Sequence, residues 1–385
     1  GLWSTGVSVA QQGPVTIIGL VGVSGSSATA GNNFNNGVKL AVKEINAAGG
    51  ILGRKIEYTS MDTQSAPQTA KALAQKAVDQ SAYVVMGPVF SGSFIVSMAE
   101  TKRAEIPNFT GGEAANITQQ GNPYIFRTSF TQSTAMPKLA RYINETVKAK
   151  TVAIVWVNND FGKGGRDAMI KALEAQGIKV AADVSTDPGQ VDFSAAVLKI
   201  KQANADALFV YTNEEEAARC LRELRKQGYD KPIVGETVLT SQKVIELAGD
   251  AANGAIAHVG LTADAPMPTV KAFAEKFQKE YGYKPDHNGL KGYSGMYIVK
   301  AVTEKVGKFD GKAFASAMHG IKLSAKEYPG VLMDVRFDEK GDLDRESFMT
   351  TAVNGRQQVT PTRPPRCPPT STRAVRPPQA HPNTS

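Results

Sequence analysis

The stretch from Val15 to Asp62 constrains the fold more than any other part of the chain. An apolar run, VTIIGLVGV, gives way to the small polar loop SGSSATAG; the segment NFNNGVKLAVKEINAAGG then leads to a second extended segment, KIEYTSMD. Apolar residues recur in the middle segment at helical spacing, and Asn32 or Asn33 can cap its start. This order predicts a strand-loop-helix-strand unit, in which a parallel sheet presents loop amides to a ligand.

The alternation of strands and helices continues past this unit and restarts near Ser133, which predicts an α/β fold with two doubly wound units. At 385 residues the chain also exceeds what one hydrophobic core usually supports. Two long helices, at 269–281 and 289–306, and a short one at 312–318 follow without intervening strands. They cannot form a third sheet, so we expect them to return to one of the first two units.

The composition is typical of a folded globular protein, but the two ends of the chain differ from the rest. Hydrophobic residues make up 42% of it and charged residues 21%, and no apolar run approaches the roughly 20 residues that span a bilayer. Segment 361–385 contains eight of the 20 prolines, four arginines and no acidic residue, so it carries half of the net charge of +8. We expect 359–385 to be a disordered tail. Small residues at Ser8 and Ala10 fit a signal-peptidase site, so 1–14 is expected to be a signal-peptide remnant or a tag.

The sequence offers little for catalysis. The four histidines are dispersed, and Cys220 and Cys367 have no metal or redox spacing. Gly19, Gly22 and Gly25 give GxxGxxG, which is not the GxGxxG dinucleotide fingerprint. We therefore expect no catalytic residue, no metal site and no cofactor, and the protein is predicted not to be an enzyme.

Binding is better supported, at the loop that follows the strand YVVMG. Phe90 and Ser91 lie where a parallel strand passes into the next helix, and the amides of Gly92 and Ser93 would point into a cleft. Free amides at a helix N-terminus favour anions, and the Ser91 hydroxyl could donate to one. From spacing alone, Ser91 could equally be an ordinary helix cap.

Several segments of the chain resemble the type I periplasmic binding proteins of branched-chain amino-acid importers. They are GVKLAVKEINAAGGILGRKIEY, GPVFSGS, NPYIFRTSF, NNDFGKGG, DFSAAVLKIKQANADALFVY and FDEKGDL. The segments follow one another in the order found in that family, and the resemblance covers residues 15–358. The resemblance implies two Rossmann-like lobes that are joined by a three-segment hinge.

The implied domain boundaries follow from the hinge. The first lobe would comprise 15–132 and 264–338, and the second lobe 133–263 and 339–358. The chain crossings are expected near 131–134, 262–265 and 338–342. This division gives the late helices to the first lobe.

The resemblance also implies ligand-binding residues in the first lobe. Ser91, with Phe90 beside it, matches the hydroxyl that binds the ligand carboxylate. Gly111 matches a carbonyl that accepts a hydrogen bond from the ligand ammonium, and Gly112 follows it in the same loop. Glu113 replaces a threonine, and an ionised Glu113 would repel a carboxylate unless it turns away or meets a cation.

In the second lobe the resemblance is less complete. Phe161 matches an aromatic residue that covers the ligand, whereas Asn213 stands where a tyrosine is usual. Glu236 lies one position from the acid that takes the ammonium group, so it either fills that role or is a loop carboxylate. Ala30 replaces an aromatic residue in the first loop, which implies a roomier pocket.

As a whole, the resemblance implies an extracytoplasmic, periplasmic solute receptor of an ABC importer. It would capture a branched-chain or related amino acid in the interlobe cleft by hinge closure. Its partners would be the solute and a membrane permease, and no nucleic acid. The alternatives are a binding protein for an aromatic or aliphatic carboxylate or a small amide, or a ligand-sensing receptor domain.

Overall fold

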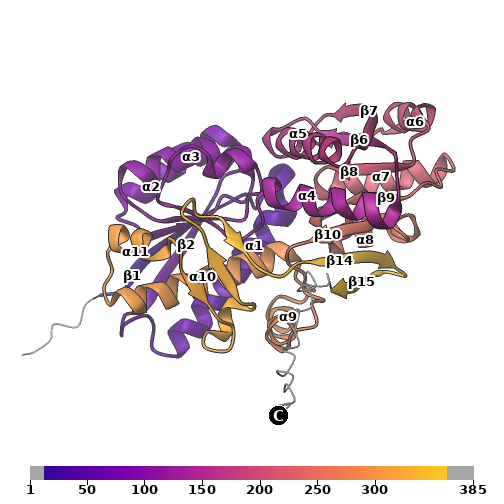
Figure 1. The fold of residues 1–385 in the computed structure, drawn as a ribbon. Helices are drawn as coiled ribbons and strands as arrows, with labels where there is room; N and C mark the ends of the chain where they lie inside the picture. The colour runs from indigo at the N-terminus through magenta and orange to yellow at the C-terminus, as the bar shows by residue number, and fades with distance from the viewer. Residues whose placement is uncertain (1–12, 362–385) are drawn as a thin grey trace, which may run out of the picture.

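The computed structural model describes residues 13–361. Two sheets, each covered by helices, form two lobes that lie side by side (Figure 1). The first lobe surrounds a five-stranded sheet and the second lobe a seven-stranded sheet. The predicted α/β fold with two doubly wound lobes is confirmed. The proposed signal-peptide remnant or tag and the proposed tail lie almost entirely outside the described residues.

The first lobe is built on a fully parallel sheet with the strand order β2-β1-β3-β4-β5. Its strands are β1 (Val15–Val21), β2 (Ile56–Asp62), β3 (Val84–Met86), β4 (Asn108–Thr110) and β5 (Ile125–Arg127). The inner strands β1, β3 and β4 are almost entirely buried, as expected for strands with helices on both faces, and so is the edge strand β5, whose Arg127 amide donates to the Gly341 carbonyl. Strand β2 lies at the edge and is partly exposed.

Six helices cover this sheet, including the three late ones. They are α1 (Ala28–Ala47), α2 (Pro67–Asp79), α3 (Ser91–Arg103), α9 (Pro268–Tyr281), α10 (His287–Val306) and α11 (Gly311–Met318). Helix α1 starts at Ala28, so the predicted cap at Asn32 or Asn33 is wrong. Both asparagines lie inside the helix, and their amides donate to carbonyl oxygens one turn earlier. The loop can become helical this early because Gly31 has no side chain and packs directly against the backbone of Gly22.

The second lobe contains a mixed sheet with the strand order β15-β14-β10-β9-β8-β6-β7. Its strands are β6 (Thr151–Val157), β7 (Lys179–Thr186), β8 (Ala207–Tyr211), β9 (Ile233–Gly235), β10 (Ile256–Val259), β14 (Phe348–Val353) and β15 (Arg356–Pro361). The pairs β10–β14 and β14–β15, at one edge, are antiparallel, and the other described pairs of this sheet are parallel. The helices are α4 (Gln132–Tyr142), α5 (Asp160–Ala175), α6 (Ser194–Ala203), α7 (Glu214–Lys226) and α8 (Gln242–Ala248).

The chain passes between the lobes three times, at 128–131, 260–267 and 345–347. The third crossing lies later than the predicted 338–342. That segment is instead the turn of a hairpin in the first lobe, because Asp342 pairs with Arg127 at 2.6 Å and the Gly341 carbonyl accepts the Arg127 amide. Residues 339–344 therefore belong to the first lobe.

This hairpin belongs to a small antiparallel sheet, and the strands after it reach the second lobe. The sheet comprises β11 (Lys322–Leu323), β12 (Val335–Phe337) and β13 (Leu343–Asp344). Strand β15 then runs to Pro361, so the boundary of the predicted tail at 359 falls inside a strand. Residue 359 lies in a strand because this segment pairs with β14, where Val359 is the partner of Thr350.

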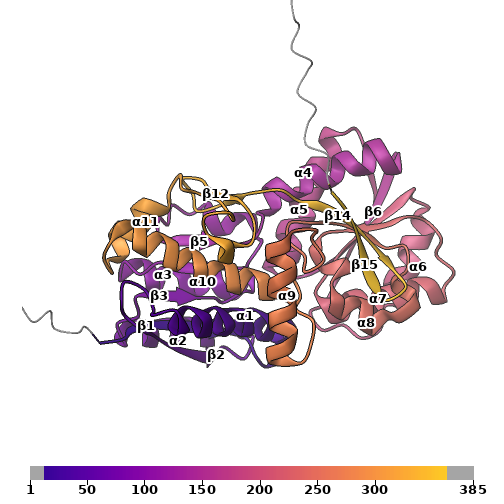
Figure 2. The ribbon, with the colours of Figure 1, turned by 90° about the horizontal axis from the view of Figure 1, so that it is seen from below.

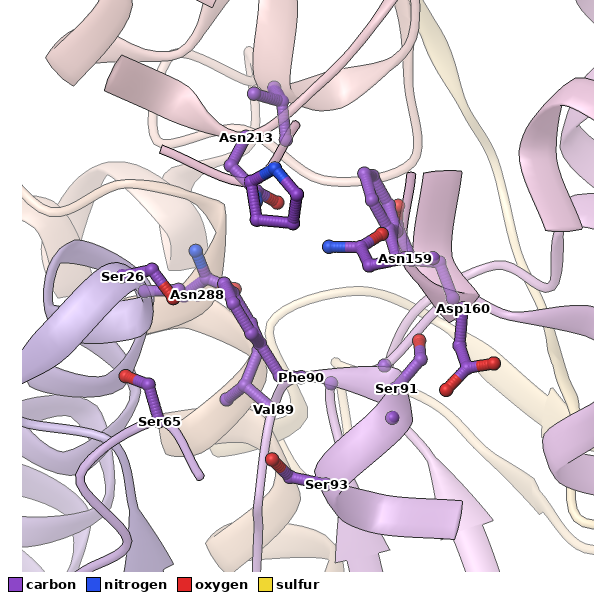
Figure 3. A pocket seen from close by; sticks show the side chains of 18 of the residues that line it. Ser26, Ser65, Val89, Phe90, Ser91, Ser93, Asn159, Asp160, Asn213 and Asn288 are labelled. Atoms are coloured by element: carbon purple, nitrogen blue, oxygen red, sulfur yellow. The ribbon is translucent and has the colours of Figure 1, made fainter. Parts of the chain in front are cut away.

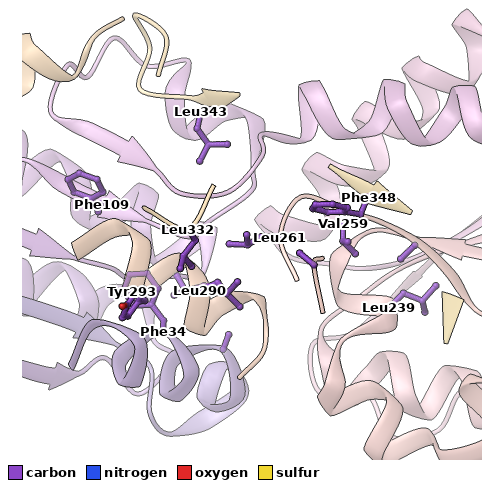
Figure 4. Packing of buried hydrophobic residues seen from close by; sticks show 14 of the residues in the cluster. Phe34, Phe109, Leu239, Val259, Leu261, Leu290, Tyr293, Leu332, Leu343 and Phe348 are labelled. Carbon is purple, nitrogen blue, oxygen red and sulfur yellow. The ribbon is translucent and has the colours of Figure 1, made fainter. Parts of the chain in front are cut away.

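Helices α1 and α10 cross at very close range, at glycines (Figure 2). A Cβ on Gly37 would run into the Gly289 carbonyl, and one on Gly292 would run into the Phe34 carbonyl. Phe34 packs beside Leu290 in the buried core (Figure 4). This contact fixes α10 in the first lobe and places its first two turns at the edge of the interlobe space.

Candidate functional site

A cavity of about 420 Å³ lies between the lobes (Figure 3). Its first-lobe wall comes from the loops after β1, β2, β3 and β4 and from the start of α10, and its second-lobe wall from the starts of α5 and α7. The sequence-predicted residues that line it are Phe90, Ser91, Gly111, Gly112, Glu113, Phe161 and Asn213. Carboxyl ends of parallel strands meet here from both sheets, which is where open α/β sheets bind ligands.

Ser91 begins helix α3 and is 2% exposed. Its Oγ accepts the Ala114 amide at 3.2 Å, so the hydroxyl proton remains available to a group in the cavity. The N-cap residue of α3 is Phe90 and Ser91 is the first residue of the helix, so Ser91 is not the ordinary helix cap that its spacing also allowed. Across the cleft, Asp160 of α5 lies so close that a Cβ on Gly92 would be 2.9 Å from its Oδ2.

Glu113 meets a cation, which is one of the alternatives left open by the sequence, and that cation is Lys291. Its Oε1 lies 3.3 Å from the ammonium of Lys291, and this Nζ also donates to the Gly111 carbonyl at 3.1 Å. Lys291 comes from the second turn of α10, and its side chain is only 4% exposed. The ion pair offsets the negative charge that the sequence placed in this wall.

Near Glu113, the second lobe supplies a pair of stacked aromatic rings. Phe161 and Tyr211 stack at a centroid distance of 4.3 Å. Gln132 holds both, because its Nε2 donates to the Phe161 carbonyl and to the Tyr211 hydroxyl. Burial first, and then the nearby Glu113 carboxylate, raise the pKa of Tyr211 well above its usual value, so Tyr211 stays a neutral hydrogen-bond donor.

Asn213 and Glu214 at the start of α7 give the second-lobe wall its polar groups. Asn213 is 5% exposed, and its Nδ2 is buried without a hydrogen-bond partner. Figure 3 shows this side chain extending from the second lobe into the space between the lobes. Burial, followed by the Asp286 carboxylate of α10, raises the pKa of Glu214 to about 8. Glu214 is therefore largely protonated at neutral pH.

Glu236 is not brought to this cavity. It lines a separate space of about 10 Å³ on the far side of Glu113, and both of its oxygens lie within 3.1 Å of His258 Nδ1. Burial raises the pKa of Glu236, and the neighbouring His258 opposes that shift. Its carboxylate already has a partner inside the second lobe.

Sequence reasoning missed Lys291, Tyr211 and Asn288. A signal existed for Lys291, because the segment HNGLKGYSG places one lysine among small and apolar residues of a buried helix. Within residues 13–361, no three His, Cys, Asp or Glu side chains are grouped so that they could hold a metal ion. In the same range, no helix has the length and apolar character of a membrane span.

Two α/β lobes with a polar cavity between them define a two-lobed solute-binding protein. The model of the periplasmic binding protein family matches residues 14–357. The chain therefore belongs to the periplasmic binding protein family, and the resemblance in its sequence is confirmed.

Relatives and solved structures agree with this assignment. The Leu/Ile/Val-binding protein BraC3 of Rhizobium johnstonii is 30% identical over 334 residues, 86% of this chain and 89% of that protein. The branched-chain amino acid transporter substrate binding protein LivJ from Streptococcus pneumoniae, solved with isoleucine, has a TM-score of 0.82 at 26% identity and covers 91% of this chain and 100% of its own. A solute binding protein from R. palustris, solved with benzoate, has a TM-score of 0.82 at 21% identity, covering 91% and 96%, which shows a shared fold.

Proposed function

We propose that this protein is the periplasmic solute receptor of an ABC importer and that it binds a small carboxylate between its lobes without altering it. The cavity supports this function most directly, because both lobes line it and helix α3 points its N-terminus at it. The free amides of a helix N-terminus and a buried hydroxyl, that of Ser91, suit a carboxylate.

Hinge closure follows from the two-sided lining. A ligand held by α3 and α10 on one side and by α5 and α7 on the other makes its full set of contacts only when the lobes are together. Binding then shifts the protein toward the closed form. The membrane permease of the importer recognises that form.

Two ligand classes are candidates. The names of the relatives favour a branched-chain amino acid, since BraC3 is a Leu/Ile/Val-binding protein and the LivJ structure contains isoleucine. An aromatic or aliphatic acid without an amine is the second candidate. The ammonium group of Lys291, which already occupies the Gly111 carbonyl, favours this class.

A thermal-shift panel of amino acids, aromatic acids, aliphatic acids and small amides tests this function. A compound at 100 times its Kd should add about 2.7 kcal/mol to the free energy of unfolding. Ser91→Ala should weaken the binding of that compound by about 10- to 100-fold, because the substitution removes a hydrogen bond to a charged group. Ser97→Ala is the matched control, since Ser97 is buried in the same helix and bonds only to Phe94 among the described contacts.

Two results would contradict the proposal. One is a panel in which no carboxylate stabilises the protein. The other is a stabilising carboxylate whose Kd is the same for Ser91→Ala as for the unchanged protein.

A further inference from the structure

The cavity already contains an ammonium group at its inner wall. Lys291 Nζ is the donor in hydrogen bonds of 3.1 Å to the Gly111 carbonyl and 3.3 Å to Glu113 Oε1. The stem of Lys291 also packs on Gly111, where a Cβ would lie 3.0 Å from its Cδ. A ligand ammonium at this wall would have to share the Gly111 carbonyl and the Glu113 carboxylate with Lys291, and would lie beside its positive charge.

Three side chains around the cavity have hydrogen-bond donors that no described contact uses. Lys291 has one ammonium proton left after its two hydrogen bonds. The Ser91 hydroxyl accepts from Ala114 and keeps its own proton. Asn213 presents a buried amide nitrogen without a partner from the opposite lobe. Both lobes thus place donors around one cavity, which suits a ligand with acceptor oxygens.

Two other ionisable groups of the cavity, Glu214 and His287, carry little charge at neutral pH. Glu214 is largely protonated at neutral pH, because burial and Asp286 raise its pKa to about 8. Burial, and then Lys291, lower the pKa of His287, so it is neutral. The Asp160 carboxylate and the Lys163 ammonium, both in the first turn of α5, also line the cavity.

We propose that the ligand is an organic carboxylate without an α-ammonium group, with Lys291 as the fixed cation that takes the place of a ligand amine. This inference rests on the proposed function, namely that the cavity binds a carboxylate solute. The apolar part of the lining fits an aromatic ring or a branched alkyl chain. It comprises Val89, Phe90, Phe161, Pro188 and Val238.

Matched pairs of compounds test this directly by calorimetric titration. The pairs are 4-methylpentanoate with leucine and 3-phenylpropanoate with phenylalanine, and benzoate is added as a single compound. The acid of at least one pair should bind at least tenfold more tightly than its amino acid, because the positive charge of Lys291 would repel a ligand ammonium.

Substitution of the lysine should reverse this preference. Lys291→Met keeps the length of the side chain and frees the Gly111 carbonyl and the Glu113 carboxylate for a ligand amine. Binding of the acid should weaken at least tenfold. The affinity for the amino acid of the same pair should rise relative to the affinity for the acid. Lys163→Met is the control, since this exposed lysine also lines the cavity but makes neither contact; it should keep the acid preference.

A second variant covers the case in which Lys291→Met does not fold. Glu113→Gln leaves Lys291 without its carboxylate partner, so the acid should bind at least threefold more tightly. Tighter binding of the amino acids than of the acids by the unchanged protein would overturn this inference and leave the proposed function standing. An unchanged or weaker acid affinity in Glu113→Gln would also overturn it. Failure of every acid and every amino acid to bind would instead overturn the proposed function.

Discussion

Replacement of Arg127 by methionine is expected to lower the free energy of unfolding by about 3–5 kcal/mol. Arg127 is completely buried at the end of β5, and its Nε lies 2.6 Å from Asp342 Oδ1. The same guanidinium donates to the carbonyls of Gly112 and Ala114. Methionine would fill part of the space but leave a largely buried carboxylate without its cation and the Ala114 carbonyl without its donor from Arg127.

Urea unfolding of the two proteins measures this difference. Arg336→Met is a matched control, because Arg336 and its partner Asp344 belong to the same hairpin region but are more than half exposed. An exposed ion pair contributes roughly 0–1 kcal/mol, so the control should change stability little. Equal effects of the two substitutions would contradict the role that we assign to Arg127.

The loss of Arg127 should also affect the cavity. The loop that Arg127 holds runs from Gly112 to Ala114, between the Gly111 carbonyl and the amide that donates to Ser91. Residual folded Arg127→Met should therefore bind the solute more weakly than the unchanged protein. The same anchor fixes the hairpin just before the third interlobe crossing.

Gly37→Ala is expected to destabilise the first lobe by about 3 kcal/mol, the upper end of the usual effect of overpacking. The added methyl group would overlap the Gly289 carbonyl, so α1 and α10 would have to separate along their contact. Backbone atoms cannot turn aside as a flexible side chain can. Because α10 carries Asn288 and Lys291 into the cavity, ligand affinity should fall as well.

Lys39→Ala, on the exposed face of α1, is the control for helix propensity and surface effects. It should change the free energy of unfolding by less than about 0.5 kcal/mol. Thermal melts with and without a bound carboxylate measure both variants. A Gly37→Ala protein as stable as the control would contradict this prediction, because α1 and α10 could then separate without loss of stability.

The fold could be predicted from local patterns because strands and helices alternate with their own periods. The helix that begins at Ser91 is an example, since an apolar strand and the Gly-Pro turn at Gly87 and Pro88 precede it. The start of α1 was missed because Gly31 looks like a loop residue; only its contact with Gly22 shows why glycine is needed in a helix there. The third crossing was missed because the Arg127–Asp342 pair joins residues far apart in sequence.

Part of the site could also be predicted from local patterns of strands and helices. Ser91 and Gly111 follow strands directly, so strand positions alone place them at one edge of the sheet. Lys291 reaches that edge only because the late helix α10 packs on α1. Glu236 precedes a turn on the correct edge of the second sheet, but its contact with His258 on the neighbouring strand depends on side-chain direction.

X-ray scattering from the empty and the loaded protein tests the central claim most directly, namely that two lobes close on a small carboxylate. The loaded sample should contain whichever acid gives the largest thermal shift. The account predicts a smaller radius of gyration with the acid bound than without it. Superimposable scattering profiles at saturating acid would contradict it.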